Sequence, residues 1–278
     1  MARPTRLYEA YVFDMDGTIY LGDHLLPGAS RLIDELRRRE IPVRFLSNNP
    51  TKDPDMYAAK LSGLGLPTPV ADIANTVVTT VRWLLDHRPG AVVFPIAEEP
   101  LCRALEAAGI EISEDPSRID VVISSYDRHF DYRKLQIAFD AIWFHKRAEL
   151  IETNPDLYCP FPGGRGEPDC AAITAAIEAC TGTKKVATMG KPAAVMVTEA
   201  LRGLDVTPEN CLMVGDRLMT DIAMAVDAGM ASGLVLTGDS TRAEAEALAE
   251  SQQPTYIVER IDELLPADVW AEQGWDAS

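Results

Sequence analysis

The chain has 278 residues with 47% hydrophobic and 25% charged residues, and its formal net charge is -17 at pH 7. This composition is ordinary for a globular protein and excludes a disordered chain, while the length predicts one large or two modest domains. Because nucleic-acid binding requires clustered Lys and Arg, the acidic balance argues against a nucleic-acid partner.

Strands and helices alternate from the start of the chain. The first predicted elements are a strand over 10–13, a helix over 30–39, a strand over 43–46 and a helix over 54–64. This alternation with short connections is typical of a parallel sheet with helices on its faces. Ligands of such sheets bind at the carboxyl ends of the strands. The segments Asp14-Met15-Asp16 and Ser47-Asn48-Asn49 both lie at predicted strand ends.

A second series of alternating strands and helices interrupts the first. It comprises predicted helices over 77–85, 101–108, 132–146 and 170–181, and strands over 91–94, 121–123 and 150–151. The first pattern resumes with a helix to 201, strands at 212–214 and 233–236, and a helix from 222. We therefore predict a doubly wound parallel-sheet (Rossmann-like) α/β core of residues 1–79 and 189–278, with an inserted α/β cap domain of residues 80–188. The acidic tail after Pro266 is expected to be loosely held.

Several features predict a cytoplasmic protein. The N-terminus leads into a strand rather than into an apolar signal-peptide core. No segment approaches the roughly 18 apolar residues that span a bilayer, so no membrane partner is expected. The five cysteines are odd in number and show no Cys-x-x-Cys spacing, which is typical of reduced thiols in a cytosol.

Two carboxylates at a strand end suggest phosphoryl chemistry. A strand-end carboxylate such as Asp14 can act as a nucleophile, and a second acid two positions on, Asp16, can protonate the departing alkoxide. Side chains at i and i+2 of an extended strand share a face, so both are expected to point at one substrate. Carboxylates beside a phosphate repel it, so a cation is required. Asp216 and Asp221, after another predicted strand, complete an oxygen-rich set suited to Mg²⁺.

Plainer interpretations of the same residues stay open at this point. Asp-x-Asp-Gly and Gly-Asp are also common turn sequences. A calcium loop is rejected, because its fifth, sixth and twelfth positions hold Thr18, Ile19 and Leu25. Lys191 taken alone is a surface lysine, although it precedes a proline at a predicted helix start, where an anion is favoured. Ser47 taken alone is a helix cap.

Four segments together resemble the four motifs of the haloacid dehalogenase-like hydrolase superfamily, in order. They are Phe13-Asp14-Met15-Asp16-Gly17-Thr18, Leu46-Ser47-Asn48-Asn49, Gly190-Lys191-Pro192 and Gly215-Asp216-x₄-Asp221. The insertion between the second and third motifs contains Thr153-Asn154-Pro155-Asp156 and Asp169-Cys170-Ala171-Ala172-Ile173. It resembles the large α/β (C2-type) cap of the NagD-like branch.

The resemblance implies a role for each matching residue. Asp14 is the expected nucleophile, and Asp16 the expected general acid and then base. Mg²⁺ is expected on the Asp14 carboxylate, the Asp16 backbone carbonyl and Asp216, with Asp221 steadying the site.

The phosphate pocket has its own expected residues. Ser47 and Lys191 are expected to hold the phosphoryl oxygens, and Gly17 and Asn48 to shape the pocket around them.

The implied function is a Mg²⁺-dependent phosphatase acting on a small-molecule phosphate monoester of the sugar, glycerol, glycolate, nucleotide or pyridoxal phosphate class. A phosphomutase or phosphotransferase of the same superfamily and a non-catalytic phospho-ligand-binding protein are the alternatives. The cap loop 158–169 is expected to select the substrate, with Tyr158, Arg165 and Asp169 as its polar candidates. Such caps often pair, so a homodimer through the cap is one expected assembly.

Overall fold

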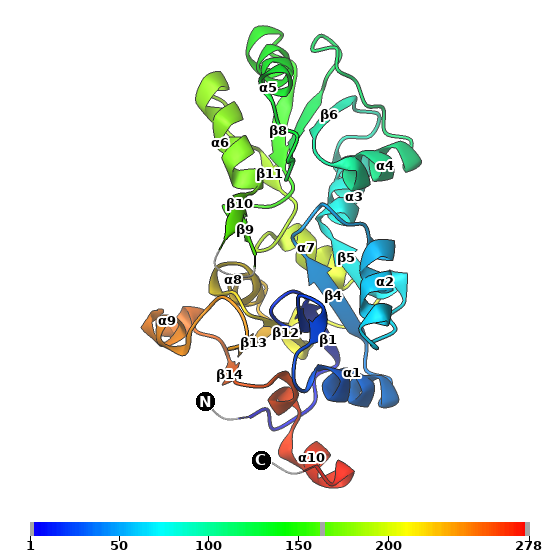
Figure 1. The fold of residues 1–278 in the computed structure, drawn as a ribbon, viewed down its shortest axis with the longest axis vertical. Coiled ribbons are helices and arrows are strands. Elements are labelled where there is room, and N and C mark those ends of the chain that lie inside the picture. Colours follow the sequence, from blue (N-terminus) through cyan, green and yellow to red (C-terminus); the bar gives the residue numbers. More distant parts are fainter. Residues whose placement is uncertain (1–2, 162–164, 276–278) are drawn as a thin grey trace. The chain divides into compact units, whose positions relative to one another are not determined.

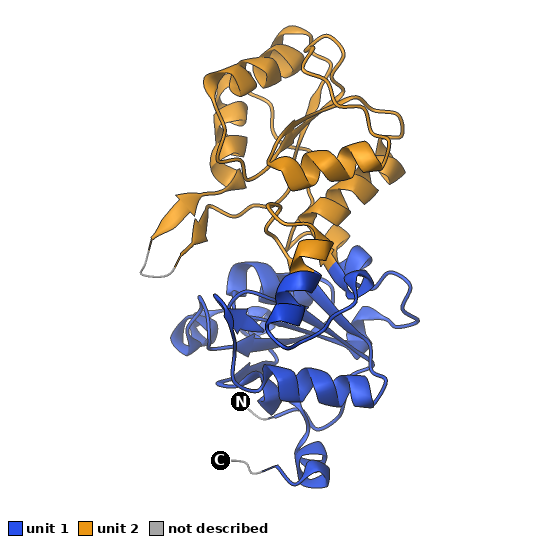
Figure 2. Ribbon diagram, turned by 45° about the vertical axis from the view of Figure 1, so that its right-hand side comes forward, with its two compact units in different colours: residues 1–46, 58–73, 197–278 blue, residues 47–57, 74–196 orange. Residues whose placement is uncertain are grey.

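The computed structural model describes residues 3–161 and 165–275. The chain divides into two compact units, which Figure 2 shows in different colours. The first unit contains residues 1–46, 58–73 and 197–278, and the second contains residues 47–57 and 74–196. The second unit includes the whole segment from 80 to 188 that the sequence predicts as a cap. The predicted domain boundaries themselves stay a prediction.

The first unit is organised around a six-stranded sheet (Figure 1). Its strands are, in spatial order, β14 (Tyr256–Val258), β13 (Ala231–Val235), β12 (Cys211–Gly215), β1 (Ala10–Asp14), β4 (Val43–Ser47) and β5 (Ile73–Asn75). The pairings of β1 with β12 and β4, and of β13 with β12 and β14, are parallel. Residues 10–13 of β1 are completely buried, as expected for a parallel strand covered on both faces. The predicted α/β core is confirmed.

Helices and short strands connect these elements. They are β2 (Tyr20–Leu21), β3 (His24–Leu25), α1 (Ala29–Arg38), α2 (Pro54–Gly63), η1 (Val70–Asp72), α7 (Ala194–Ala200), η3 (Pro208–Asn210), η4 (Leu218–Ile222), α8 (Ala223–Asp227), α9 (Arg242–Ala247), η5 (Glu250–Gln252), η6 (Ile261–Leu264) and α10 (Ala267–Gln273). In α1, Leu32, Ile33 and Leu36 lie on one face and are fully buried. Hydrophobic burial therefore fixes this helix, as its spacing predicts.

The tail after Pro266 differs from the expectation. It forms α10, in which Val269 and Trp270 are buried. The Trp270 indole N–H donates to the Asp262 carbonyl at 3.1 Å, and the Arg31 guanidinium lies over its ring. The expectation of a loosely held tail is wrong for residues 267–273, because the burial of two apolar side chains is enough to dock this seven-residue helix.

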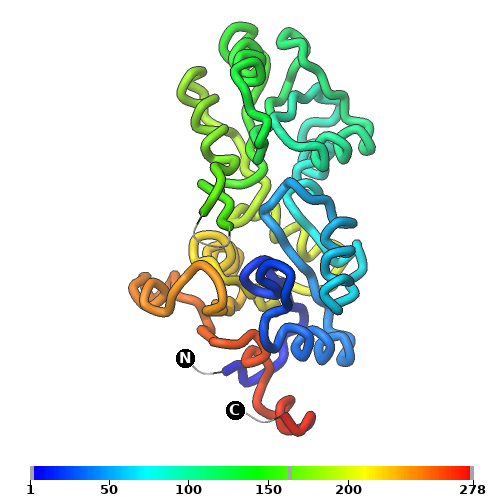
Figure 3. Tube along the Cα trace, viewed as in Figure 1, coloured from blue at the N-terminus to red at the C-terminus, as the bar shows by residue number. Residues whose placement is uncertain are grey.

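The second unit has its own parallel sheet. Its strands are, in spatial order, β11 (Ala187–Thr188), β8 (Glu149–Glu152), β7 (Val121–Ser124) and β6 (Val93–Ile96). Its helical segments are α3 (Thr76–His87), α4 (Glu99–Ala107), α5 (Tyr132–Phe139), the π-turn η2 (Asp140–Phe144) and α6 (Cys170–Thr181). Figure 3 shows the trace running from cyan in α3 through green to α6.

Helices cover both faces of this second sheet. One cluster joins Val121 and Ile151 to residues of α3 and α4, and the other joins Val122 and Leu150 to residues of α5 and α6. Alternate residues of the strands thus serve opposite cores. The second α/β unit that the sequence predicts is confirmed as an α/β fold.

A short antiparallel hairpin was not predicted. It consists of β9 (Tyr158–Pro160) and β10 (Gly166–Pro168), in the segment between β8 and α6. Each strand is only three residues long and contains a proline, which weakens any period-2 signal in the sequence. None of the helices in the described ranges combines the length and the apolar character that a bilayer-spanning helix requires.

Candidate active site

Three carboxylates of the first unit meet at the ends of two neighbouring strands. Asp14 is the last residue of β1, and Asp216 directly follows the last residue of β12. The two strands are parallel neighbours, so their carboxyl ends lie at one edge. One carboxylate oxygen from each of Asp14, Asp216 and Asp221 lies within 4.8 Å of the others. The structure therefore brings together three of the residues that the sequence predicts for the metal site.

Asp221 reaches this group through a π-turn. Its backbone N–H donates to the Arg217 carbonyl at 3.1 Å, and its carboxylate accepts the Arg217 backbone N–H at 3.1 Å. Asp221 is completely buried and lies directly against Gly215, where any Cβ would overlap its carboxylate. The wide turn η4 thus folds Asp221 back onto the end of β12, in keeping with the frequent use of π-turns at functional sites.

Asp216 is enclosed by glycines and by a loop that the sequence interpretation missed. A Cβ on Gly17, whose φ is +86°, would lie 2.6 Å from an Asp216 carboxylate oxygen, and a Cβ on Gly238 would overlap that carboxylate. The Asp239 backbone N–H donates to Asp216 Oδ2 at 2.8 Å, and the Thr237 hydroxyl donates to the Gly17 carbonyl at 2.6 Å.

The sequence contains a signal that loop 237–240 lies at the same sheet edge as Asp216. It follows β13, the neighbour of β12, so the strand-end rule applies to it as it does to Asp216. It carries Gly238 and Asp239, which are turn-forming residues.

Asp16 lies outside the strand. Because β1 ends at Asp14, strand alternation does not set the direction of the Asp16 side chain. A turn sets it instead, in which Gly17 N–H donates to the Tyr20 carbonyl at 2.8 Å and Met15 accepts the Ile19 N–H at 2.8 Å. Asp16 is exposed, and its carboxylate is not part of the three-carboxylate group. This turn leaves Asp16 accessible to a solvent-borne ligand.

The three-carboxylate group fits a hard divalent cation. Asp216 and Asp221 are almost completely buried, so their like charges repel in a weakly screened environment. A bound cation removes this repulsion, and carboxylate oxygens are the ligands that Mg²⁺ and Ca²⁺ prefer. The residues present therefore suit the Mg²⁺ that the sequence predicts.

Lys191 and Asn48 form a second polar cluster, in the second unit. The Asn48 side-chain carbonyl accepts the Lys191 backbone N–H at 2.7 Å, and its amide group donates to the Lys191 carbonyl at 3.0 Å and to Asp156 Oδ2 at 3.2 Å. Lys191 is 2% exposed. The carboxamide of Asn48 thus bonds both the N–H and the carbonyl of Lys191. This pair of hydrogen bonds is called the Asn48 bracket below.

Gly190 makes this bracket sterically feasible. A Cβ at this position would lie 2.7 Å from Asn48 Oδ1 and 2.8 Å from the Thr153 carbonyl. The Asn48 carbonyl in turn accepts hydrogen bonds from the Thr76 hydroxyl at 3.0 Å and from the Asn154 amide at 3.1 Å. Asn48 therefore joins the end of β4, the start of α3 and the loop after β8.

Ser47 ends β4, one residue beyond the position paired with Asp14. Its hydroxyl lies 2.8 Å from the Tyr57 hydroxyl and accepts the Asn49 backbone N–H at 3.1 Å. Ser47 is 9% exposed. Both contacts orient the hydroxyl at the strand end.

The three cap candidates have different surroundings. Tyr158 lies in β9 and is half exposed, and Arg165 is exposed directly before β10. Asp169 is buried and caps α6, where its carboxylate accepts the Cys170 backbone N–H at 2.6 Å. Capping is therefore a contact that Asp169 makes within the cap itself.

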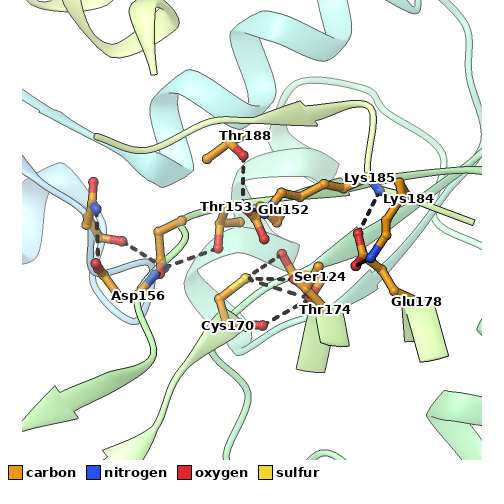
Figure 4. A network of polar contacts seen from close by, with 12 residues as sticks. Ser124, Glu152, Thr153, Asp156, Cys170, Thr174, Glu178, Lys184, Lys185 and Thr188 are labelled. Atoms are coloured by element: carbon orange, nitrogen blue, oxygen red, sulfur yellow. Dashed lines mark hydrogen bonds and ion pairs between the residues drawn. The ribbon is translucent and has the colours of Figure 1, made fainter. Parts of the chain in front are cut away.

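Buried polar side chains connect the strand ends of the second unit (Figure 4). The Thr174 hydroxyl donates to Ser124 Oγ at 2.8 Å, and the Cys170 thiol lies 3.2 Å from the Ser124 carbonyl. Burial raises the pKa of the Cys170 thiol, which therefore stays protonated. The completely buried Glu152 accepts from the Thr188 hydroxyl at 2.8 Å and pairs with the Lys185 ammonium at 2.5 Å.

Comparisons with known proteins identify the family of this chain. Residues 11–111 match the family described as haloacid dehalogenase-like hydrolase, and residues 188–264 match one described as HAD-hydrolase-like. The acid sugar phosphatase of Staphylococcus saprophyticus is 31% identical over 258 residues, which cover 93% of this chain and 97% of that relative.

Solved structures of similar proteins share the fold. The 4-nitrophenylphosphatase of Thermotoga maritima has a TM-score of 0.85 at 33% identity, covering 92% of this chain and 96% of that one. NagD from E. coli K-12 has a TM-score of 0.82 at 26% identity, covering 93% and 98%. Together with the strand-end carboxylates, these matches show that the chain belongs to the haloacid dehalogenase-like hydrolase superfamily, in its NagD-like branch, and is a phosphatase.

Proposed function

We propose that this phosphatase is Mg²⁺-dependent and hydrolyses a phosphate monoester of a small metabolite through an aspartyl-phosphate on Asp14. The main support is the grouping of the Asp14, Asp216 and Asp221 carboxylates at the ends of β1 and β12, with Asp16 exposed in the turn that follows β1. A binding protein has no need for a nucleophile and a separate acid, so this pair favours turnover over the non-catalytic alternative.

The first half-reaction forms the phospho-enzyme. An oxygen of the Asp14 carboxylate attacks phosphorus, and the bond between phosphorus and the ester oxygen breaks. Asp16, as the carboxylic acid, gives its proton to the departing alkoxide. The products of this step are the free alcohol, the aspartyl-phosphate and the Asp16 carboxylate.

The second half-reaction restores the enzyme. The Asp16 carboxylate takes a proton from a water molecule, whose oxygen attacks phosphorus as the bond to Asp14 breaks. Inorganic phosphate leaves, and Asp14 is again a carboxylate. Because Asp16 is exposed, its carboxylate is accessible to water.

Other residues hold the phosphoryl group. We assign the phosphoryl oxygens to the Ser47 hydroxyl and the Lys191 ammonium, with Gly17 and Asn48 shaping the pocket. Mg²⁺ would neutralise the negative charge of the phosphate and the carboxylates. It would be held by Asp14, the Asp16 carbonyl and Asp216, with Asp221 behind them. The bracket of Asn48 on the Lys191 backbone supports this assignment, because it limits the positions that Lys191 can adopt.

The proposed substrate class is small phosphate monoesters of sugars, glycerol, glycolate, nucleotides or pyridoxal. The name of the Staphylococcus relatives, acid sugar phosphatase, favours sugar phosphates. Tyr158, Arg165 and Asp169 are the proposed contacts to the leaving group. A panel of phosphorylated metabolites, assayed by released phosphate, ranks these classes directly.

The catalytic roles are tested with p-nitrophenyl phosphate as the probe, with and without Mg²⁺. Asp14→Asn is expected to abolish release, and Asp16→Asn to slow it by about 10²- to 10⁴-fold with accumulation of phospho-enzyme seen as a mass increase of the intact chain. Full activity in Asp14→Asn, or release that does not depend on Mg²⁺, contradicts the proposal. Phosphate transfer to a second metabolite without net release supports the phosphomutase alternative instead.

We also propose a homodimer through the cap and a cytoplasmic location. Trp143 and Phe144 of η2 are 54% and 65% exposed, and aromatic side chains of this kind are enriched in protein interfaces. Light scattering is expected to give a dimer mass for the natural chain and a monomer mass for Trp143→Ser with Phe144→Ser. A monomer of the natural chain at micromolar concentration rules the dimer out.

The proposed cytoplasmic location rests on the cysteines. Their odd number supports a reducing compartment.

A further inference from the structure

The hairpin of β9 and β10 has two different faces. Cys159 lies directly opposite Glu167, and Tyr158 directly opposite Pro168. Because opposed residues of an antiparallel pair share a face, Cys159 and Glu167 project to one side. Tyr158 projects to the other side, as alternate residues of a strand do. On that other side, a Cβ on Gly166 would lie 3.1 Å from the Tyr158 ring.

The face with Cys159 and Glu167 contacts Tyr126, in the loop after β7. The Tyr126 hydroxyl donates to Glu167 Oε2 at 2.5 Å, and Tyr126 is only 3% exposed. The pKa of Tyr126 is raised. Burial is the largest cause, and the hydrogen bond to Glu167 and the nearby Cys159 add to it. The phenol therefore stays protonated and remains a donor. A hydrogen bond to a carboxylate is about twice as strong as one between neutral groups.

The position of the Tyr126 ring is itself secured. The Arg128 guanidinium lies over the ring at 5.6 Å from its centroid. Two hydrogen bonds, of 2.5 Å and 2.7 Å, join Arg128 to the Glu98 carboxylate, which lies just before α4. Tyr126 is thus held against the body of the second unit, and its hydroxyl bonds the hairpin to that body through Glu167.

We propose that Tyr126 is a positioning residue for substrate selection, because its hydrogen bond to Glu167 sets the direction of the hairpin face that carries Tyr158. Tyr126 acts through Glu167 and does not touch the substrate. This inference rests on the proposed function for the role of Tyr158 at the leaving group. Its structural part, the attachment of the hairpin through Tyr126, is independent of that role.

The kinetic test compares Tyr126→Phe with the natural chain, using p-nitrophenyl phosphate as substrate and inorganic phosphate as competitive inhibitor. Tyr126→Phe is expected to raise KM by about tenfold while kcat changes by less than about twofold. The inhibition constant of phosphate is expected to stay the same, because phosphate has no leaving group to meet the hairpin.

Two further variants serve as matched controls. Glu167→Gln keeps an oxygen that accepts from the phenol and is expected to retain most of the natural KM, whereas Glu167→Ala is expected to behave like Tyr126→Phe. Tyr132→Phe removes the same hydroxyl from an 80% exposed tyrosine of the same unit and is expected to have no effect. An unchanged KM in Tyr126→Phe, or a parallel rise in the phosphate inhibition constant, overturns the inference.

Hydrogen exchange tests the attachment without any activity measurement. The Phe161 N–H donates to the Arg165 carbonyl and the Asp169 N–H to the Leu157 carbonyl, so both report on the hairpin. Their exchange is expected to be about tenfold faster in Tyr126→Phe and Glu167→Ala than in Tyr132→Phe. Equal exchange in all three overturns the inference. If the natural chain releases no phosphate, the proposed function fails, and the exchange result still decides the attachment.

Discussion

Glycines set the geometry of the acidic site at the scale of single residues. Gly17, Gly215 and Gly238 each lie against a carboxylate of the site, at a distance that leaves no room for a Cβ. Close approach of backbone to a functional group is a common reason for glycine. The carboxylates Asp216 and Asp221 are consequently held by backbone contact on several sides.

Gly17→Ala is expected to lower kcat/KM by about 100-fold, because a displacement of roughly 1 Å of a positioned group costs that much. The added methyl group would lie 2.6 Å from Asp216 Oδ2. Gly22→Ala is the matched control, since Gly22 also has a positive φ, of +59°, but its Cβ would meet no atom within 4 Å. It is expected to cost about 1 kcal/mol of stability and to leave kcat/KM within about twofold. Similar kinetic losses in both variants would show that backbone strain, rather than contact with Asp216, is the cause.

At the scale of strands and helices, polar contacts at strand ends hold the second unit together. Glu152 ends β8, and Thr188 ends β11 beside it. Lys185, in the connection from α6 to β11, supplies the positive charge for the buried Glu152 carboxylate. Since an unpaired buried charge is costly, this ion pair keeps β11 and its preceding loop on the sheet.

Lys185→Met is expected to lower the free energy of unfolding by about 1–3 kcal/mol, because Glu152 then keeps a buried charge with less compensation. Lys184→Met is the control, since Lys184 pairs with Glu178 but is 81% exposed. That change is expected to cost less than about 0.5 kcal/mol. Chemical denaturation measures both, and adding Glu152→Gln to Lys185→Met is expected to recover part of the loss. Equal destabilisation by the two lysine variants contradicts the assigned importance of the Glu152 pair.

At the scale of the whole molecule, the net negative charge and the three-carboxylate group both oppose folding. The chain carries a net charge of -17, and three of its carboxylates lie within 4.8 Å of one another. Their mutual repulsion opposes folding in the absence of a cation. Ligands that bind only the folded state stabilise it by mass action.

Mg²⁺ is therefore expected to raise the melting temperature, since a ligand at 100 times its Kd adds about 2.7 kcal/mol. For a protein of this size that is a shift of roughly 5–10 °C. Asp216→Asn is expected to lose this shift while retaining an oxygen for the Asp239 N–H. Sodium chloride at the same ionic strength controls for general screening of the acidic chain. A Mg²⁺ shift that survives in Asp216→Asn, or one that sodium chloride reproduces, contradicts a specific cation site.

The linear sequence was sufficient for the α/β class, the inserted second α/β segment and the residues of the acidic group. Strand-forming runs and helix-forming periodicity are local, so they are visible without the fold. Parallel strands bring their carboxyl ends to one edge, and for this reason Asp14 and Asp216 were predicted to meet although about 200 residues separate them.

Contacts between distant segments were beyond such reasoning. The bracket of Asn48 on Lys191, the closure of loop 237–240 on Asp216 and the attachment of Glu167 to Tyr126 join residues that share no local pattern. The direction of Asp16 depends on a turn rather than on strand alternation, and α10 docks through two apolar side chains. Each of these features depends on which surfaces meet after folding, and that information resides in the packing of the whole chain rather than in any one segment.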